Sequence, residues 1–347
     1  MSNDRYLSIL EEIKKHGGDV DREPNDKVLI IDGLNTFIRT FSAIPTTNDD
    51  GVHVGGIVGF LKSVGYAVKT LGPTRTILIF DGKGGSNRRR KIYPEYKNKR
   101  KPKIRLNRTD MYSSSDDEHQ SMLMQLARGL EYFECLPLTI LTLEGTEADD
   151  VIAYTAEQVL SDSEVIIMST DKDFLHLVDD RVRVWSPTKK KLYDKDKLFE
   201  EYGIPAHNFL MYRMIEGDKS DNIGGINGIG IKTLLNKMPV ILKENKISID
   251  ELIDGTDDER LKSLLDKEIL ERNYKLMQLF DVDISDSNKL KISYHINETI
   301  PMMNKSKFRS MFLEDKLYGT LPNLDTWLMT NWNMLNKYAD MYDGKKT

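Results

Sequence analysis

Acidic residues follow nearly every short apolar run in the first 200 residues of the sequence. Two examples are Asp32, which ends the run at 27–32, and Asp81 at the end of the run at 76–82. Ligands of open α/β sheets bind beyond the carboxyl ends of the strands, so we expect these side chains to converge on one crevice. The acids at or just beyond the ends of the runs are Asp32, Asp81, Glu147, Asp149, Asp150, Asp171 and Asp173.

Converging carboxylates repel one another, and without a cation several of them would have to be protonated at pH 7. A divalent ion removes this conflict. Ligand sets made only of oxygen favour Mg²⁺ or Mn²⁺ over Zn²⁺. Each acid also has a simpler explanation, since Thr146 could cap a helix whose first turn carries acids, and a single Asp often forms a turn. The joint occurrence of these acids favours a metal site.

A basic segment, residues 83–108, follows the second apolar run. It contains twelve Lys or Arg and a single acid, Glu95, whereas the whole chain has a net charge of -5. Tyr93 and Tyr96 lie among the cations, a pattern suited to binding phosphates and stacking on a base. The segment begins two residues after Asp81, so its cations are expected to overhang the acidic crevice. The alternative is a solvated basic loop.

A glycine-rich stretch, "GDKSDNIGGINGIGIKT" at 217–233, does not fit either common nucleotide-binding motif. Ile231 separates Gly230 from Lys232, which breaks the P-loop pattern, and the spacing also fails the dinucleotide-binding GxGxxG pattern. It predicts a glycine hairpin between two helices, with amide groups near Ile231 directed at a phosphate. Such a hairpin holds duplex DNA by its backbone without reading sequence. A plain turn between helices is the alternative.

The elements that position these residues follow from periodicity. Apolar runs alternate with amphipathic helical patterns, which predicts an α/β fold with a parallel sheet over about 27–200. From Pro205 onward the pattern is helical. The predicted strands are 27–32, 76–82, 137–145, 164–171 and 182–187.

Composition limits the class of protein. The 347 residues include a single cysteine, Cys135, which excludes an internal disulfide and fits a reducing compartment. No apolar run is long enough to span a bilayer, and the first residues lack the apolar core of a signal peptide. We therefore expect a soluble, monomeric, cytoplasmic protein, in the host cytoplasm if a phage encodes it.

Six motifs, in this order, resemble the 5'-nuclease or flap endonuclease family, which includes phage 5'-3' exonucleases, RNases H and the 5'-nuclease domain of bacterial DNA polymerase I. They are "LIIDGLNTFIRTF", "FDG", "RRKIYPEYKNKR", "EADDVIA", "STDKDFLHL" and "GDKSDNIGGINGIGIKT". The resemblance covers roughly residues 27 to 235. It implies a PIN-like nuclease domain at 27–204 with a helical arch at about 83–120, and a helix-hairpin-helix region at 205–290 that often holds K⁺. Residues 1–26 and 291–347 match no motif.

The resemblance also implies site residues. The metal-binding positions are Asp32, Asp81, Glu147, Asp149, Asp150, Asp171, Asp173, Asp218 and Asp221. The catalytic cations are Arg89, Lys97 and Arg100. The residues expected to contact DNA are Arg88, Arg90, Tyr96, Gly225, Gly228, Gly230, Lys232 and Thr233.

The expected reaction is hydrolysis of phosphodiester bonds with two Mg²⁺ ions, for which Mn²⁺ can substitute. We assign Asp32, Asp81, Glu147 and Asp149 mainly to one ion and Asp171, Asp173 and Asp221 mainly to the other, with Asp150 and Asp218 partly in the outer shell. The expected substrates are DNA with a 5' flap or 5' end, and RNA–DNA hybrids. A single-strand-binding protein or a sliding clamp is a candidate partner of the C-terminal region.

Three alternatives stay open from the sequence. A Toprim-type nuclease or primase also has an Asp-x-Asp after a strand, but it does not explain "FDG" or the glycine hairpin. A haloacid-dehalogenase-type phosphatase needs a second Asp two residues after the first, where this chain has Leu34 after Asp32. A DNA-binding module with purely structural acids is the non-enzymatic alternative.

Overall fold

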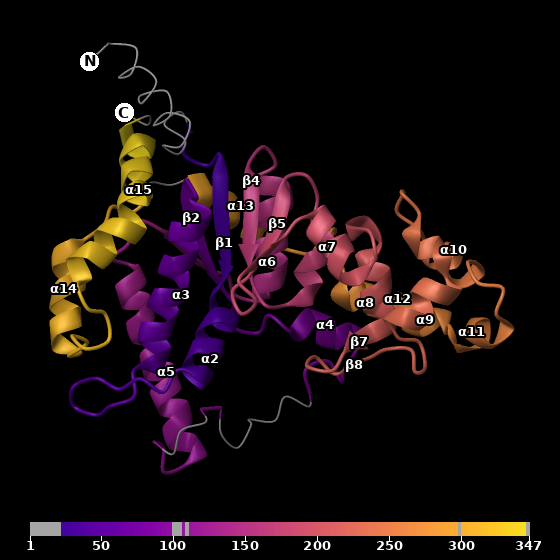
Figure 1. Cartoon of the computed structure of the whole chain (residues 1–347), viewed down its shortest axis with the longest axis horizontal. Coiled ribbons are helices and arrows are strands. Elements are labelled where there is room, and N and C mark those ends of the chain that lie inside the picture. Colours follow the sequence, from indigo (N-terminus) through magenta and orange to yellow (C-terminus); the bar gives the residue numbers. More distant parts are fainter. Residues whose placement is uncertain (1–21, 99–105, 108–110, 298–299, 345–347) are drawn as a thin grey trace, which may run out of the picture.

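A six-stranded sheet lies at the centre of the molecule and carries helices on both faces (Figure 1). The computed structural model describes residues 22–98, 106–107, 111–297 and 300–344. The strand order is β3-β2-β1-β4-β5-β6, and all neighbours are parallel except β6, which runs antiparallel to β5. The strands are β1 (Lys27–Asp32), β2 (Arg75–Phe80), β3 (Thr139–Thr142), β4 (Glu164–Met168), β5 (Val182–Ser186) and β6 (Lys191–Tyr193).

The sheet confirms the predicted parallel α/β fold, although β2, β3 and β4 end before the predicted positions and one further strand is present. The predicted strand at 164–171 ends early, at Met168, because the polar residues that follow make local hydrogen bonds instead of continuing the ladder. Ser169 Oγ donates to Asp32 at 3.0 Å, and Asp171 accepts the N–H of Asp173 at 2.8 Å. The three-residue strand β6 was not predicted, since so short a run carries no clear alternation.

Side chains of alternate strand residues pack into two separate cores. Val28 and Ile30 of β1 face one core with the helices of the second half of the chain, whereas Leu29 and Ile31 face the other. All four side chains are fully buried. Burial on both faces explains why the strands read as continuous apolar runs.

The helices that cover the sheet and continue beyond it confirm the predicted change to helical structure after Pro205. They are α2 (Gly33–Ala43), α3 (Gly55–Leu71), α4 (Asn87–Ile92), α5 (Ser115–Phe133), α6 (Ala148–Tyr154), α7 (Lys195–Tyr202), α8 (Phe209–Glu216), α9 (Ile231–Lys237), α10 (Ile249–Asp254), α11 (Glu259–Leu264), α12 (Lys267–Met277), α13 (Asp286–Asn297), α14 (Lys305–Glu314) and α15 (Leu324–Gly344). A π-helical turn, η1 (Thr155–Val159), extends α6, and a 3₁₀ turn, η2 (Lys172–Leu177), follows β4.

The last two helices pack back onto the first half of the chain, beside α3 (Figure 1). Trp332 is fully buried, and its ring lies 5.9 Å from that of Trp327, which packs against the same core. These two tryptophans therefore stabilise the fold rather than form an exposed docking surface. Among the helices of the described residues, none combines the length and apolar character needed to cross a membrane.

Candidate active site

The ends of β1 and β2 carry the first two predicted acids. Asp32 ends β1 and caps α2, where its carboxylate accepts the Asn35 N–H at 3.1 Å. Asp81 follows β2 directly, and its carboxylate accepts the Ala148 N–H at 2.8 Å. That bond holds the loop after β2 against the first turn of α6, which carries Asp149. Acids from three elements thus reach one edge of the sheet.

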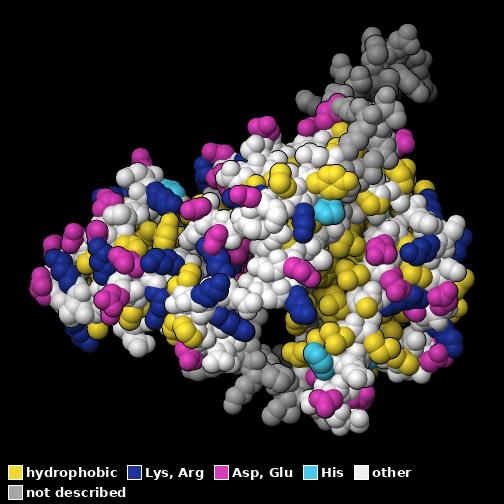
Figure 2. Space-filling model, turned by 180° about the vertical axis from the view of Figure 1, so that it is seen from behind, with side chains coloured by type: hydrophobic (Ala, Val, Ile, Leu, Met, Phe, Trp, Pro, Cys, Tyr) yellow, Lys and Arg dark blue, Asp and Glu magenta, His cyan; other side chains and the backbone are white. Residues whose placement is uncertain are grey.

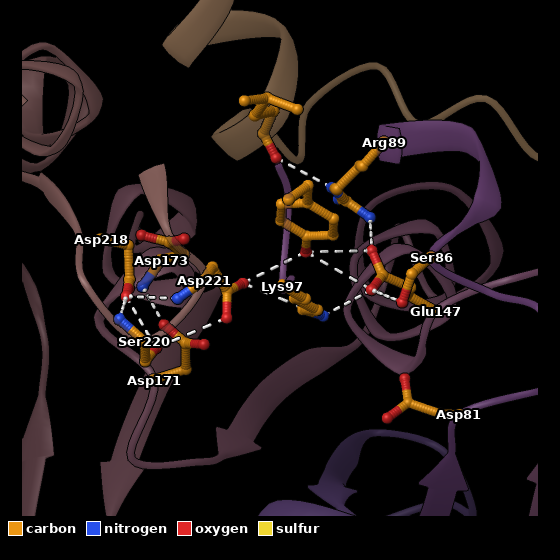
Figure 3. A network of polar contacts seen from close by, with 12 residues as sticks. Asp81, Ser86, Arg89, Lys97, Glu147, Asp171, Asp173, Asp218, Ser220 and Asp221 are labelled. Carbon is orange, nitrogen blue, oxygen red and sulfur yellow. Dashed lines mark hydrogen bonds and ion pairs between the residues drawn. The ribbon is translucent and has the colours of Figure 1, made fainter. Parts of the chain in front are cut away.

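Glu147 immediately precedes α6 and is 2% exposed. The Arg89 guanidinium, Lys97 Nζ at 2.5 Å and Ser86 Oγ at 3.0 Å all bind its carboxylate (Figure 3). The Tyr96 hydroxyl also donates to it, at 3.3 Å. These donors compensate the charge of Glu147 inside the protein. Thr146, the predicted helix cap, instead precedes the N-cap position that Glu147 occupies.

Arg89 lies inside the protein, with 4% of its surface exposed. Its guanidinium forms a bidentate pair with Asp150 at 2.7 and 2.9 Å, and its Nε donates to the Leu276 carbonyl at 2.8 Å. The residue therefore ties α4 to α6 and to the end of α12. From the sequence, we expect Arg89 above the crevice and Asp150 near a metal, whereas in the structure the two form a buried ion pair.

Tyr96 and Lys97 connect the basic segment to the acids. Tyr96 is 2% exposed, so its ring is not available for stacking, and its hydroxyl donates to Asp221 at 3.1 Å. The Lys97 backbone is left-handed, with φ of 56°, and its N–H donates to the Asp221 carbonyl at 2.8 Å. Lys97 Nζ lies between the two sets of acids (Figure 3).

The other predicted cations differ in placement. Arg88 pairs with Asp283 at 3.2 Å, and the exposed Arg90 donates from Nε to the Tyr96 carbonyl at 3.4 Å. Arg100 lies outside the described residues. Neither Arg88 nor Arg90 contacts an acid of the candidate site.

A second acid group consists of Asp171, Asp173, Asp218 and Asp221. Carboxylate oxygens of the first three lie within 4.8 Å of one another, a spacing that one cation can bridge. The prediction that Asp171 and Asp173 come directly from a strand is wrong, because Asp171 caps η2 and Asp173 lies within it. Asp218 ends the short strand β7 (Gly217–Asp218).

Arg213, on α8, is a site residue that the sequence analysis missed. It is 3% exposed, and it pairs with Asp173 at 2.8 Å and with Asp218 at 3.0 Å. Its third carboxylate partner is Glu216. This guanidinium offsets part of the charge of the second acid group. The arginine within the apolar stretch "FLMYRMI" could have indicated this residue, because an arginine is almost never fully buried unless it is paired with other groups.

Two cavities meet at this site. An acid-lined cavity of about 380 Å³ is lined by Asp32, Asp81, Asp149 and Asp171 together with Lys97. A neighbouring cavity of about 630 Å³, the hairpin cavity, extends from Asp171 and Asp218 to Gly230 and Ile231 at the start of α9. From behind, the surface is hollowed between the two halves of the molecule, and Lys and Arg side chains lie along the hollow (Figure 2).

The electrostatics of the acid-lined cavity favour a cation. Burial raises the pKa of Asp32 from 3.8 to about 6. Burial, followed by the charge of Asp173, raises the pKa of Asp171 to about 7. The pKa of Asp149 is raised as well, by burial and then by Asp171. The metal-free protein therefore retains protons here that a bound cation would displace.

Glu147 and Lys97 form a contrasting, permanently charged pair. Burial alone would raise the pKa of Glu147, but Arg89 and Lys97 outweigh burial and lower it to about 2. Burial would likewise lower the pKa of Lys97, but Glu147 and its acidic neighbours raise it. Lys97 is therefore a cation at neutral pH, held at the wall of the acid-lined cavity.

These pKa values predict how the stability of the metal-free protein depends on pH. Unfolded chains release the protons of Asp32 and Asp171 near pH 4, whereas the folded protein retains them up to about pH 6 and 7. The folded state therefore binds more protons at these two carboxylates in this window, so their contribution to stability falls as pH rises from 4 to 7, whereas His176, whose pKa burial lowers to about 3, contributes the opposite trend. Each pKa unit corresponds to about 1.4 kcal/mol. We expect the thermal midpoint in a chelator to fall by several degrees relative to that in Mg²⁺.

The measurement is a set of melting curves between pH 4 and 7 in a chelator and in Mg²⁺. Mg²⁺ should flatten the decline, because it stabilises the ionised carboxylates. Asp171→Asn should also flatten the curve measured in chelator. A decline of equal size with and without Mg²⁺ would contradict the assignment of these groups.

The glycine-rich stretch forms the predicted connection between two helices. β7 pairs with β8 (Ile223–Gly224), and α9 begins at Ile231, with Gly230 at the N-cap position. The backbone at Gly228 has φ of +86°, a conformation that favours glycine. A side chain at Gly225 would clash with the carbonyl oxygens of Ile215 and Glu216. Lys232 and Thr233 follow in the first turn of α9, where Lys232 is exposed.

Comparisons with known proteins agree with this arrangement. The family model of the 5'-3' exonuclease N-terminal resolvase-like domain matches residues 27–203. A 5'-3' exonuclease of Aquifex aeolicus is 31% identical over 293 residues, which make up 83% of this chain and 92% of that protein. The thermostable DNA polymerase I of Thermus aquaticus is 34% identical over 250 residues, but the match spans 72% of this chain and only 27% of the polymerase.

Solved structures support the fold. The T5 D15 flap endonuclease, crystallised as a pseudo-enzyme-product complex with DNA and metal ions, superposes with a TM-score of 0.58. It is 24% identical, and the match covers 84% of this chain and 99% of that one. Together with the family match, this likeness excludes the Toprim and haloacid-dehalogenase alternatives. The chain belongs to the 5'-3' exonuclease family, the family of flap endonucleases and of the 5'-nuclease domains of bacterial DNA polymerases.

Proposed function

We propose that the protein is a divalent-metal-dependent 5'-3' exonuclease and flap endonuclease that acts in DNA replication or repair. The observation that carries this proposal is the acid-lined cavity, where carboxylates from four separate elements meet one lysine. Among the residues that the structure describes, no His or Cys lines this cavity, and the oxygen donors suit Mg²⁺, with Mn²⁺ as a substitute. The raised pKa values of Asp32 and Asp171 support the fit of a cation.

The residues available for two ions fall into two sets. Asp32, Asp81 and Asp149 would hold one ion at the acid-lined cavity, and the second acid group would hold the other, with Asp171 facing both. Two bound Mg²⁺ ions would activate a water molecule and offset charge on the scissile phosphate. Glu147 and Asp150, which are bound to cations of the protein, would act in the outer shell.

Protein cations complete the mechanism. Lys97 would lie against the scissile phosphate and stabilise negative charge that grows as the bond breaks. Arg89 and Tyr96 would act indirectly, because they hold Glu147, and through it Lys97, in place. Arg213 would orient Asp173 and Asp218 through its ion pairs with both carboxylates. The products would carry a 5'-phosphate and a 3'-hydroxyl.

The substrate would be DNA with a 5' flap or a 5' end, with RNA in RNA–DNA duplexes as a further substrate. The hairpin cavity leads from Asp218 to the N-terminus of α9, whose first backbone amides could bind duplex phosphates. A K⁺ ion bound at this hairpin would also help to hold the duplex phosphates. A single-strand-binding protein or a sliding clamp stays a predicted partner.

The direct test is cleavage of a 5'-labelled flap oligonucleotide by purified protein. We expect cleavage near the base of the flap in Mg²⁺ or Mn²⁺ and none in a chelator. A single strand without a duplex arm should be cleaved weakly or not at all. Binding of the flap without any cleavage in either metal would favour the non-catalytic alternative and overturn the proposal.

The hairpin provides a second prediction, at Gly230 rather than at Gly228. Any side chain at Gly228 is strained because φ there is +86°, whereas a Cβ at Gly230 meets no atom within 4 Å. Gly230→Asp places a carboxylate at the N-cap of α9, which should stabilise the helix by a few tenths of a kcal/mol or leave it unchanged. The same charge should repel duplex phosphates and weaken binding about tenfold.

The measurement is affinity in Ca²⁺ for flaps with long and short duplex arms, beside a melting curve. Gly230→Asn is the matched control, because it caps the helix equally well without a charge. We expect Gly230→Asp to lose affinity mainly for the long duplex and Gly230→Asn to lose little. Equal loss on both substrates would show that the hairpin does not hold the duplex arm.

A further inference from the structure

Asn35 lies at the junction between the acid-lined cavity and the hairpin cavity. It lies in the first turn of α2, three residues after Asp32, and it lines both cavities. Of the described residues, only Thr170 and Asp171 also line both cavities. A nucleic-acid strand that runs from one cavity into the other would therefore pass these residues.

The orientation of the Asn35 amide is fixed by Thr170. Asn35 Oδ1 lies 2.8 Å from Thr170 Oγ1 and accepts the Thr170 backbone N–H at 3.4 Å. A backbone N–H can only donate, so the oxygen of the amide faces Thr170 and the NH₂ group faces away. Within the described part of the chain, Asn35 Nδ2 has no hydrogen-bond partner, and its half-buried side chain leaves it accessible.

The chemistry around this donor suits an anion that approaches a wall of acids. Asp32 and Asp171 line the acid-lined cavity together with Asn35, so a phosphate passing here meets negative charge. A lysine at this position would pair with those carboxylates, as Lys172 pairs with Glu216 at 3.4 Å. A neutral amide instead offers a donor that does not compete with a bound cation for the carboxylates.

We propose that Asn35 Nδ2 donates to a non-bridging oxygen of a backbone phosphate on the cut strand, one to three phosphates to the 3' side of the scissile bond. This inference rests on the proposed function. If the scissile phosphate lies in the acid-lined cavity and the duplex arm reaches the start of α9, the strand between them crosses Asn35. In a 5' nuclease, the duplex arm is on the 3' side of the cut.

The test combines protein variants with modified substrates. Single methylphosphonates, which replace one phosphate oxygen by a methyl group, are placed in turn at the first, second and third phosphates 3' of the cut. On the unmodified flap, Asn35→Ala should lower kcat/KM about 10- to 100-fold, the range for one hydrogen bond to a charged group. At one of the modified positions, the methylphosphonate should lower kcat/KM of the wild-type protein by a similar factor. The same methylphosphonate should not lower kcat/KM of Asn35→Ala any further.

Asn35→Asp tests the same donor without removing the contact to Thr170, because the carboxylate still accepts its hydrogen bonds. It should be at least as defective as Asn35→Ala on the unmodified flap. Asn333→Ala, an exposed position on α15, is the matched control and should cleave like wild type.

Failure of the Asn35 inference and failure of the proposed function give different results. If Asn35→Ala loses the same factor on the unmodified flap and on every methylphosphonate substrate, Asn35 contacts none of these phosphates and the inference is overturned. Activity of Asn35→Asp close to wild type would overturn it as well. If wild-type protein does not cleave the unmodified flap in Mg²⁺, the proposed function fails instead.

Discussion

Replacement of Asp171 by Asn is expected to abolish cleavage, with a loss in kcat of at least about 10³-fold, while the metal-free protein becomes more stable. Asp171 lines both cavities and belongs to the group whose oxygens lie within 4.8 Å of one another, so its loss removes a ligand facing both proposed ions. The gain in stability follows because burial and neighbouring acids already raise the pKa of Asp171 to about 7. An uncharged amide ends that repulsion.

Asp173→Asn should be equally inactive but should not gain stability. Asp173 pairs with the buried Arg213 at 2.8 Å, and removal of one partner leaves a less compensated cation inside the protein. The two variants therefore share a loss of activity and differ in the sign of the change in melting temperature. The exposed Asp162 provides the control variant Asp162→Asn, which should alter neither property. Near-normal single-turnover cleavage by Asp171→Asn would contradict the assignment.

Lys97→Ala is expected to lower the single-turnover rate by about 10²- to 10³-fold, the cost of losing one preorganised donor at a transition state. Its Nζ lies 2.5 Å from Glu147 and lines the acid-lined cavity, and its backbone is fixed by the Asp221 carbonyl. Because the charge that it stabilises grows during the reaction, ground-state affinity should change much less.

The control for Lys97 is Lys91→Ala, an exposed lysine of the same basic segment on α4. Neutralising it should reduce affinity and the salt dependence of binding slightly and leave the rate of bound substrate unchanged. Rates are measured in Mg²⁺ and affinities in Ca²⁺. If both variants lose only affinity, and by similar factors, Lys97 only contacts a phosphate and its assignment to the transition state is wrong.

The sequence was most informative where a side chain is positioned by the backbone next to it. Asp32 and Asp81 lie at strand ends, and parallel strands bring such ends to the same edge of the sheet. The start of α9 at Ile231 likewise follows from local glycine spacing. These features depend only on local conformation and on the direction of the strands.

The sequence was least informative where burial depends on partners far along the chain. Arg89 and Tyr96 belong to a basic segment whose pattern predicts a phosphate-binding surface. Both are instead buried and donate hydrogen bonds to Glu147, which lies more than fifty residues later. Arg213 is buried because Asp173, forty residues earlier, lies beside it. No local pattern shows which members of a charged run face inward, because that depends on how the loops pack together.

The most direct test of the central claim, that these carboxylates hold two divalent ions, is anomalous diffraction from crystals soaked in Mn²⁺. We expect two peaks, about 3.5 to 4 Å apart. One should lie among Asp32, Asp81 and Asp149, and the other among Asp171, Asp173 and Asp218. Asp171→Asn crystals should lose occupancy of at least the second peak. Absence of any peak among these carboxylates in fully soaked wild-type crystals would contradict the account.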